Sequence, residues 1–410
     1  PPPPQPAPPH PHYVPIKPAC HHRPLAVGVT SLSNAGGGGG VGGGQFKTQN
    51  SKLKTARGWV AFLIPHSSFI IQWMRILHIL SQRPSLTGSG ITLDAMVRHA
   101  AGAGHDQRVV VGVPGSDPAP EVGGLAAERI HPLLFDQGPL DFAVPGMSDV
   151  MPYPSTRFSA LSREQLTAYR CAWVDHLRPI LAEFQPDLIQ SHHVWLMSAL
   201  LKDLAPAAPV VTQCHATGIR QMALCPHLEN DVRAGCSRND AFLVLHDDHK
   251  EQLAHCLGVP DDRIHVVGAG YREDLFHARG RETGSGSSLL YVGKYSAAKG
   301  LPWLIDAFGR IAARRPRLRL EIVGGGAGDE ARVIRDRLDG LGDRVVQHGQ
   351  LAQPQLAEVA RSTSVCVLPS FYEGLPLVLV EALACGNRLV ATALPGICSE
   401  LAPALGDALT

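Results

Sequence analysis

The sequence predicts an α/β protein with two doubly wound parallel sheets, preceded by a segment that has no regular structure. Three observations predict this class. From residue 74 onwards, short apolar runs alternate with helical patterns; a Gly/Ser-rich stretch, Gly280–Ser288, interrupts this alternation; and Pro and Gly dominate the first 73 residues. We therefore expect three parts, residues 1–73, 74–279 and 280–410.

The first part has the composition of a disordered chain. Pro1–Pro18 is rich in proline and Gly36–Gly44 is nearly all glycine, so neither can bury enough apolar surface to become ordered. Trp59–Trp73 is apolar and resembles a signal or anchor segment, but Pro65–Ser68 interrupts it and leaves runs too short to span a bilayer. We expect this part to be a nonfunctional extension and the folded protein to begin at Met74.

The second part alternates strands with helical patterns, the longest of which is Leu161–Phe184. Strands that alternate with helices favour a mostly parallel sheet covered on both faces. The predicted strands are Arg75–Leu80, Arg108–Val113, Leu188–His192, Pro209–Cys214, Ala241–His246 and Arg263–Gly268.

The third part repeats this pattern with five strands, where a complete half of this kind has about six. We therefore expect that the C-terminus is truncated. The predicted strands are Leu289–Val292, Leu318–Val323, Arg344–His348, Ser364–Leu368 and Arg388–Thr392, and the predicted helices are Leu301–Arg314, Asp329–Leu338, Gln353–Arg361 and Pro376–Cys385.

The charge and cysteine content exclude several classes of function. The net charge of +1 indicates no general attraction to nucleic acid or to an anionic membrane. The nine cysteines are scattered, which favours a reducing, cytoplasmic compartment. Cys214, Cys225 and Cys236 come nearest to a cluster, with His215 and His227 close in sequence, but their spacing fits no zinc pattern.

The block PSFYEGLPLVLVEALACG, Pro369–Gly386, carries the strongest functional signal. A buried strand ends at its first residue, and Pro376 is suited to the first position of a short helix. Glu373 then lies in the loop before the helix, Glu381 lies within it, and the free N–H groups of the first turn form an anion site. Taken alone, an isolated pair of glutamates favours a structural interpretation, with Glu381 as a solvated helix residue and Glu373 as a capping acid.

The Glu-x7-Glu spacing inside P-S-x-x-E-G-x-P, followed by A-L-A-C-G, resembles glycosyltransferase family 4. This family of retaining, metal-independent enzymes has the GT-B fold, in which two Rossmann-like domains face a cleft. YVGKYSAAKG resembles its donor-phosphate loop, EIVGGG the following strand and turn, and HGQLAQPQLAEVARSTSVCVLPS the segment before the glutamates. The resemblance covers nearly all of 74–410 and is strongest in 280–410.

The resemblance implies a donor site in residues 280–410. Glu381 would hold the ribose of the nucleotide, Glu373 would lie against the donor sugar, and Lys294 and Lys299 would clamp the diphosphate. The family usually has arginine at the position of Lys294, and lysine keeps the charge but loses the bidentate fork. The backbone of three further residues would line the sugar and phosphate pocket, namely Gly374, Leu375 and Leu377.

Two glycine-rich turns follow predicted strands. Gly324 and Gly325 lack the spacing of a dinucleotide fingerprint, and we interpret them as a turn that lets the backbone approach the nucleotide. Gly88 and Gly90 follow the first strand without the lysine of a P-loop. The resemblance implies that they form the flexible loop facing the donor phosphate, and a tight turn alone is the alternative.

Three histidines end predicted strands, at the edge where ligands bind in such sheets. The resemblance implies that His215 contacts the donor sugar near the reaction centre, although a lone histidine is more often structural. His192 and His193 are acceptor-side candidates, of which we expect one to face the acceptor and the other to pack.

The expected function is transfer of a hexose from a UDP- or GDP-sugar to a glycan, lipid or small-molecule acceptor with retention of configuration. The nucleotide-sugar is a substrate, and neither a cofactor nor a metal is expected, because no D-x-D motif is present. His215, Glu373, Lys294 and Lys299 are the expected catalytic residues. Peripheral association with the inner face of a membrane stays open. The alternatives are a nucleotide-sugar 2-epimerase of the same fold and an inactive, truncated relative that binds nucleotide.

Overall fold

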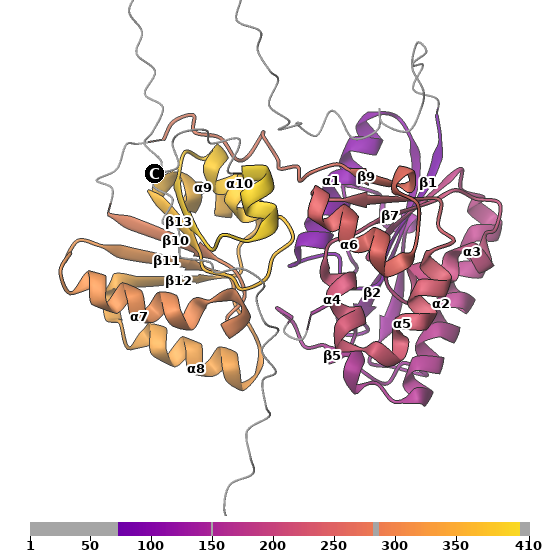
Figure 1. Ribbon diagram of the computed structural model, residues 1–410, viewed down its shortest axis with the longest axis horizontal. Coiled ribbons are helices and arrows are strands. Elements are labelled where there is room, and N and C mark those ends of the chain that lie inside the picture. The colour runs from indigo at the N-terminus through magenta and orange to yellow at the C-terminus, as the bar shows by residue number, and fades with distance from the viewer. Residues whose placement is uncertain (1–72, 149–150, 282–286, 402–410) are drawn as a thin grey trace, which may run out of the picture.

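A computed structural model describes residues 73–148, 151–281 and 287–401, which form two lobes (Figure 1). Each lobe contains one large parallel sheet with helices packed on it, so the predicted α/β class is confirmed. The expected disordered and anchor segments lie outside the described residues, except for Trp73. The boundary predicted at residue 280 adjoins residues 282–286, which are also outside.

The first lobe contains a seven-stranded sheet in the order β3-β2-β1-β6-β7-β8-β9, with every pair parallel. The sequence did not predict edge strand β3, whose residues include a proline, nor the two-residue strands β4 and β5. The bounds are β1 (Arg75–Leu80), β2 (Asp106–Pro114), β3 (Ile130–Phe135), β4 (Pro145–Gly146), β5 (Thr156–Arg157), β6 (Leu188–His192), β7 (Val210–Gln213), β8 (Ala241–Val244) and β9 (Ile264–Val266).

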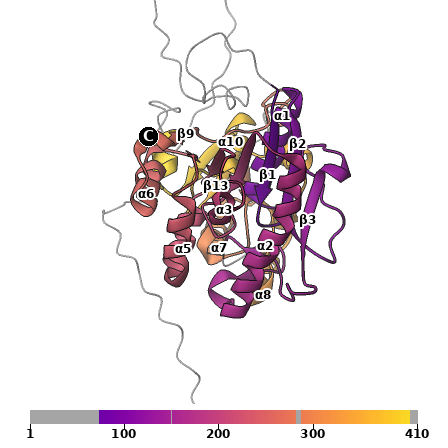
Figure 2. The same ribbon diagram turned by 90° about the vertical axis from the view of Figure 1, so that its right-hand side faces the viewer.

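Helix α2 shows how the sequence forms this lobe, which faces the viewer in Figure 2. Ser162 and Gln165 form a capping box that starts the helix. Tyr169, Trp173 and Leu177, spaced by four residues, lie on one face and are fully buried. Each such side chain contributes about 2 kcal/mol. The helices are α1 (Gly88–Gly102), α2 (Arg163–Phe184), α3 (Leu201–Leu204), α4 (Thr217–Leu224), α5 (Pro226–Cys236) and α6 (Asp247–Leu257).

The second lobe contains a five-stranded parallel sheet in the order β12-β11-β10-β13-β14. All five predicted strands are present, and the expected sixth would fall in residues 402–410, outside the described part. Pro376 is the N-cap of α10 rather than its first residue. The strands are β10 (Ser288–Val292), β11 (Arg319–Val323), β12 (Val345–Gly349), β13 (Val365–Leu368) and β14 (Arg388–Ala391), and the helices are α7 (Leu301–Ala312), α8 (Gly328–Asp339), α9 (Gln353–Ser362) and α10 (Leu377–Ala384).

The strand order places the functional loops of the second lobe side by side. Strand β10 pairs with β11 on one side and with β13 on the other. Successive strands are therefore added in one direction from β10 to β12 and in the opposite direction from β13 to β14, and this strand order reverses between β10 and β13. The carboxyl ends of these strands point towards the first lobe (Figure 1). Ligands of open α/β sheets bind at such a reversal, outside the carboxyl ends of the strands.

No helix in the described ranges combines the length and the apolar character that crossing a membrane requires.

Candidate functional site

An ion pair joins the two loops at the reversal point of the second sheet. Lys299, in the loop after β10, places its Nζ 2.5 Å from Oε1 of Glu373, in the loop after β13. The two side chains are only 25% and 12% exposed. The loops can approach because Gly300 has a φ of 71°, and a Cβ there would lie 1.9 Å from the carbonyl oxygen of Pro369. Two residues predicted to bind one donor are therefore in direct contact.

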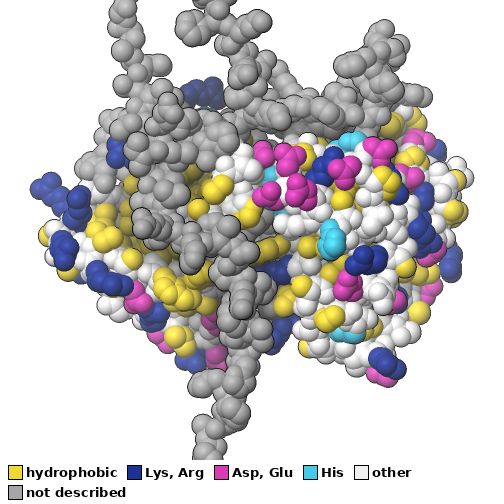
Figure 3. Space-filling model, viewed as in Figure 1, with side chains coloured by type: hydrophobic (Ala, Val, Ile, Leu, Met, Phe, Trp, Pro, Cys, Tyr) yellow, Lys and Arg dark blue, Asp and Glu magenta, His cyan; other side chains and the backbone are white. Residues whose placement is uncertain are grey.

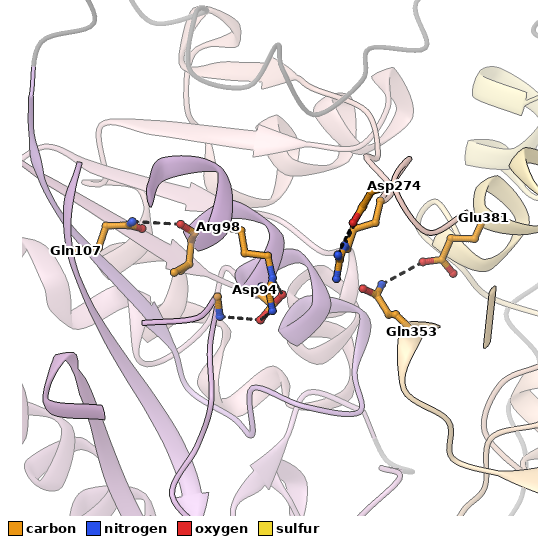
Figure 4. A network of polar contacts seen from close by, with 9 residues as sticks. Asp94, Arg98, Gln107, Asp274, Gln353 and Glu381 are labelled. Atoms are coloured by element: carbon orange, nitrogen blue, oxygen red, sulfur yellow. Dashed lines mark hydrogen bonds and ion pairs between the residues drawn. The ribbon is translucent and has the colours of Figure 1, made fainter. Parts of the chain in front are cut away.

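Glu381 is nearly completely buried in α10, with 5% of its surface exposed. Its Oε1 accepts a hydrogen bond of 3.4 Å from Nε2 of Gln353 at the start of α9. Burial raises the pKa of Glu381 to about 7. Figure 4 shows the hydrogen bond between Gln353 and Glu381. The alternative of a solvated helix residue is wrong for Glu381, because the side chain is buried. A buried carboxyl with an elevated pKa is a candidate functional group.

No side-chain hydrogen bond caps the N-terminus of α10. Pro376 caps it without a side-chain hydrogen bond, and Leu377 begins the helix. The first-turn N–H groups of a helix attract anions when no side chain satisfies them. Gly374 and Leu375 lead into this turn, and the Leu375 side chain is buried in the apolar cluster beneath it.

Lys294 lies where the two lobes meet. Its backbone carbonyl accepts a 2.7 Å hydrogen bond from the hydroxyl of Tyr291, and its Nζ lies 3.8 Å from Sδ of Met151 in the first lobe. Figure 3 shows Lys and Arg side chains at the junction of the lobes. The junction therefore carries the positive charge that a diphosphate requires.

A pocket of ≈ 550 Å³ lies beside this junction. Pro152 of the first lobe and Gln350 of the second lobe line it and are hydrogen-bonded to each other, with 3.0 Å between Nε2 and the carbonyl oxygen. The remaining lining residues belong to the second lobe, namely Tyr295, Gly324, Gly325, Gly326, Arg335, Gln347 and Gly349. The predicted glycine turn thus forms one wall of a pocket between the lobes.

The two glycines of this turn have different roles. Gly324 has a φ of 124°, and a Cβ there would lie 2.0 Å from the carbonyl oxygen of Gly293, so only glycine fits. Gly325 has no heavy atom within 4 Å of an added Cβ. Gly324 therefore permits the turn, and Gly325 leaves space above its backbone for a ligand.

The two glycines of the first lobe, Gly88 and Gly90, also differ in their surroundings. Gly88 begins α1, is exposed, and has open space around it. Gly90 is buried, its N–H bonds Oγ1 of Thr87 at 3.1 Å, and a Cβ there would lie 2.1 Å from the carbonyl oxygen of Pro84. The predicted donor-facing role does not fit Gly90. Its N–H is already hydrogen-bonded to Thr87, and the absence of a side chain is needed for the close approach of Pro84. Gly88 retains the predicted position.

The glutamate loop binds directly to the first lobe. The hydroxyl of Tyr372 donates a 3.1 Å hydrogen bond to the carbonyl of Ala216, and the guanidinium of Arg220 lies 5.2 Å from the Tyr372 ring. A Cβ on Gly374 would lie 3.3 Å from Cβ of Ala216. Sequence reasoning did not find these contacts, although Tyr372 lies within the recognised motif. Glu373 is therefore brought to the carboxyl end of β7.

His215 lies at the same contact, immediately before Ala216, whose φ is 64°. The His215 ring is half-buried, and its Nε2 is 2.9 Å from Nδ1 of His192. Burial lowers the pKa of His215 to about 4, so the ring is neutral at pH 7. Backbone strain of this kind concentrates at functional sites.

The predicted acceptor-facing role of His192 or His193 does not fit their positions. Their exposed fractions are 0% and 2%, so neither ring is open to an acceptor. His192 packs behind His215, and Nδ1 of His193 is hydrogen-bonded to Oγ1 of Thr217 at 2.9 Å. Both rings instead support the His215 segment.

The three clustered cysteines, Cys214, Cys225 and Cys236, are all buried. Burial raises the pKa of the Cys214 thiol to about 12, which disfavours the thiolate that binds metals. Among the described residues, no group of three or more His, Cys, Asp or Glu side chains is arranged to hold a metal ion.

Comparison with known proteins covers both lobes. The family described as Glycosyltransferase Family 4 matches residues 86–275, and the family described as Glycosyl transferases group 1 matches residues 286–405. D-inositol 3-phosphate glycosyltransferase 2 of Catenulispora acidiphila is 26% identical over 275 residues, 60% of this chain and 64% of that protein. The alignment thus spans just under two thirds of that relative. Mannosylfructose-phosphate synthase of Agrobacterium fabrum is 31% identical over 152 residues, 33% of this chain and 34% of that one.

Solved structures share the arrangement of the two lobes. Sucrose-phosphate synthase from Thermosynechococcus elongatus has a TM-score of 0.60 at 22% identity, covering 79% of this chain and 82% of that one. HepE of Anabaena, in complex with UDP and glucose, has a TM-score of 0.54 at 18% identity, covering 81% and 89%. At these identities the likeness shows the fold, which is GT-B. With one family matched to each lobe, the chain combines a Glycosyltransferase Family 4 domain with a Glycosyl transferases group 1 domain.

Proposed function

We propose that this protein transfers a hexose from a UDP- or GDP-sugar to an acceptor hydroxyl with retention of anomeric configuration. The Lys299–Glu373 ion pair is the observation that carries the proposal. It places a cation and a carboxylate together between β10 and β13, near the N-terminus of α10, which no side chain caps. A sugar diphosphate needs this combination, a cation for its phosphates and a carboxylate for its hydroxyls.

The donor would occupy the junction of the lobes. Lys294 and Lys299 neutralise the diphosphate, and the carboxyl of Glu381 accepts hydrogen bonds from the ribose hydroxyls. Glu373, released from Lys299 by the diphosphate, turns to the hydroxyls of the sugar. The pocket lined by Tyr295 has room for the nucleobase.

The chemical step breaks the bond between the anomeric carbon and the diphosphate oxygen and forms a bond from that carbon to the acceptor oxygen. The acceptor's proton passes to the departing diphosphate, on the face that the diphosphate leaves. Negative charge develops on the leaving group, and two lysines and the α10 N-terminus stabilise it by several kcal/mol in a site with little water. His215, neutral at pH 7, contacts the sugar opposite Glu373.

We further propose a phosphorylated small molecule as the acceptor. The relatives from Catenulispora acidiphila and Agrobacterium fabrum are each named after a phosphorylated compound, inositol 3-phosphate and mannosylfructose-phosphate respectively. In this chain Arg220 lies beside the Tyr372–Ala216 contact, and no ion pair joins it to a carboxylate of the described residues. An unneutralised guanidinium at the junction is suited to a phosphate.

Two alternatives differ in their products. A nucleotide-sugar 2-epimerase would convert the donor into its C2 epimer and form no glycoside. An inactive relative would bind nucleotide without turnover.

The test incubates the protein with UDP-, GDP- and ADP-sugars, with and without inositol 3-phosphate, and separates the products by chromatography. The proposal expects a nucleoside diphosphate and a new glycoside in equal amounts. A Glu373→Gln variant, with Glu358→Gln on the exposed side of α9 as its control, should lose the glycoside while the control keeps it. An epimer without a glycoside, or no turnover of any donor, contradicts the proposal.

A further inference from the structure

Two histidine rings form a partly buried hydrogen bond at the carboxyl ends of adjacent strands. His192 ends β6, and His215 follows β7, with which β6 pairs in parallel. Nδ1 of His192 and Nε2 of His215 are 2.9 Å apart, and the planes of the two rings differ by 10°. The pairing of the strands therefore fixes the two rings relative to each other.

Both rings are neutral at pH 7. Burial lowers the pKa of His192 well below its usual range, and the neighbouring rings of His215, His193 and His78 lower it further. Burial also lowers the pKa of His215. Only histidines contribute charge effects at this pair, since no carboxylate affects either pKa. One ring must therefore donate the single shared proton and the other accept it.

The surroundings of His192 decide which ring donates. Its second nitrogen, Nε2, is buried and has no hydrogen-bond partner in the described structure. If His192 accepted the shared proton, Nε2 would carry an orphaned, buried N–H group; if His192 donates, Nε2 carries only a lone pair. Orphaned buried N–H groups are rarer than unsatisfied acceptors. Donation from His192 Nδ1 is therefore favoured.

This choice fixes the state of His215. With Nε2 accepting from His192, its proton must lie on Nδ1. No hydrogen bond joins Nδ1 to another described residue, and Nδ1 is not among the buried nitrogens that lack a partner. The half-buried ring thus presents an N–H donor rather than a lone pair next to Ala216, where the glutamate loop binds.

We propose that His192 is a positioning residue that holds His215 in the Nδ1–H tautomer, so that His215 donates a hydrogen bond to an oxygen of the donor sugar. The inference about the tautomer is independent of the proposed function, whereas the inference about the sugar rests on the proposed function. His192 acts only through His215 and does not touch the substrate.

Nuclear magnetic resonance tests the tautomer directly. The full chain is labelled with ¹⁵N in its histidine rings, and the His215 signals are assigned by comparison with His215→Asn. We expect the Nδ1 of His215 to resonate as a protonated nitrogen and the Nε2 as an unprotonated one. The unprotonated Nε2 should become protonated in His192→Asp, whose carboxylate can only accept. A wild-type His215 that is protonated at Nε2 overturns the proposal.

Kinetics test the consequence. His192→Asn keeps an N–H donor near the position of Nδ1, whereas His192→Asp of the same size removes it. We expect His192→Asn to stay within a few-fold of the wild-type kcat, and His192→Asp to lose about tenfold or more, with little change in the acceptor KM. His105→Asn, a buried histidine outside the site, controls for the loss of a ring.

Equal losses in His192→Asn and His192→Asp overturn the positioning role, because a purely structural residue would not distinguish donor from acceptor. Thermal unfolding of each variant identifies a loss due to misfolding, and in that case the resonances of the wild-type protein decide. If the wild-type protein transfers no sugar while His215 is protonated at Nδ1, the proposed function fails and the tautomer assignment stands.

Discussion

Replacing Glu381 with Gln should stabilise the protein without ligand, and only above a defined pH. Burial raises the pKa of this carboxyl from its ordinary 4.5 to about 7, which corresponds to about 3 kcal/mol of unfolding free energy. Below pH 4.5 the carboxyl is protonated in both the folded and the unfolded chain, so it costs nothing. Between pH 4.5 and 7 the unfolded chain loses this proton and the folded chain keeps it. Wild-type stability therefore falls as the pH rises through this window.

Glutamine has nearly the same shape and cannot ionise, so Glu381→Gln escapes this cost. The variant and the wild type should have the same free energy of unfolding near pH 4.5, and at pH 8 the variant should be more stable by about 3 kcal/mol. Urea unfolding at several pH values measures the difference. Glu358→Gln, which replaces an exposed carboxylate, should stay within about 0.5 kcal/mol of wild type throughout. A Glu381→Gln difference that does not change between pH 4.5 and 8 would refute the reasoning.

The remaining predictions concern the ligand and the loops. UDP or GDP at a hundred times its dissociation constant should stabilise the wild type by about 2.7 kcal/mol, and Glu381→Ala should abolish this gain in thermal unfolding while Glu358→Ala keeps it; equal gains would contradict the ribose role. Gly300→Ala should cost on the order of 3 kcal/mol in urea unfolding, because its φ is 71° and a Cβ would overlap a backbone carbonyl. Gly325→Ala, with open space around it, should unfold like wild type, and equal losses would refute the packing argument. Lys299→Ala should lower kcat by about 100-fold or more and Lys299→Arg by much less, since arginine keeps the charge facing the diphosphate; similar rates would contradict an electrostatic role.

Local patterns in the sequence were enough to predict most of the fold. The bounds of β1 and β6 agree with the predicted strands, because β1 is a short apolar run before a turn-like segment and β6 follows the long helix α2. Strand β3 was missed because its buried residues alternate irregularly and Pro132 interrupts them. Its place at the sheet edge depends on pairing with β2, which no local pattern encodes.

The candidate site could be predicted only as a set of residues. The motif gave Glu373 and Glu381, and the resemblance gave Lys299, but the direct Lys299–Glu373 pair depends on β10 and β13 lying side by side. The burial of His192 and the packing of Gly90 also follow from tertiary contacts between segments distant in the sequence. Because of these contacts, His192, which was predicted to be on the acceptor side, instead packs against His215.

Proton NMR of a transfer reaction tests the central claim most directly. The protein is mixed with α-linked UDP- or GDP-sugars and a phosphorylated acceptor, and the anomeric signal of the product is followed alongside the release of nucleoside diphosphate. We expect an α-linked product that accumulates together with the nucleoside diphosphate and does not form when the Glu373→Gln variant replaces the wild type. A β-linked product, or a C2 epimer of the donor without a glycoside, would contradict it.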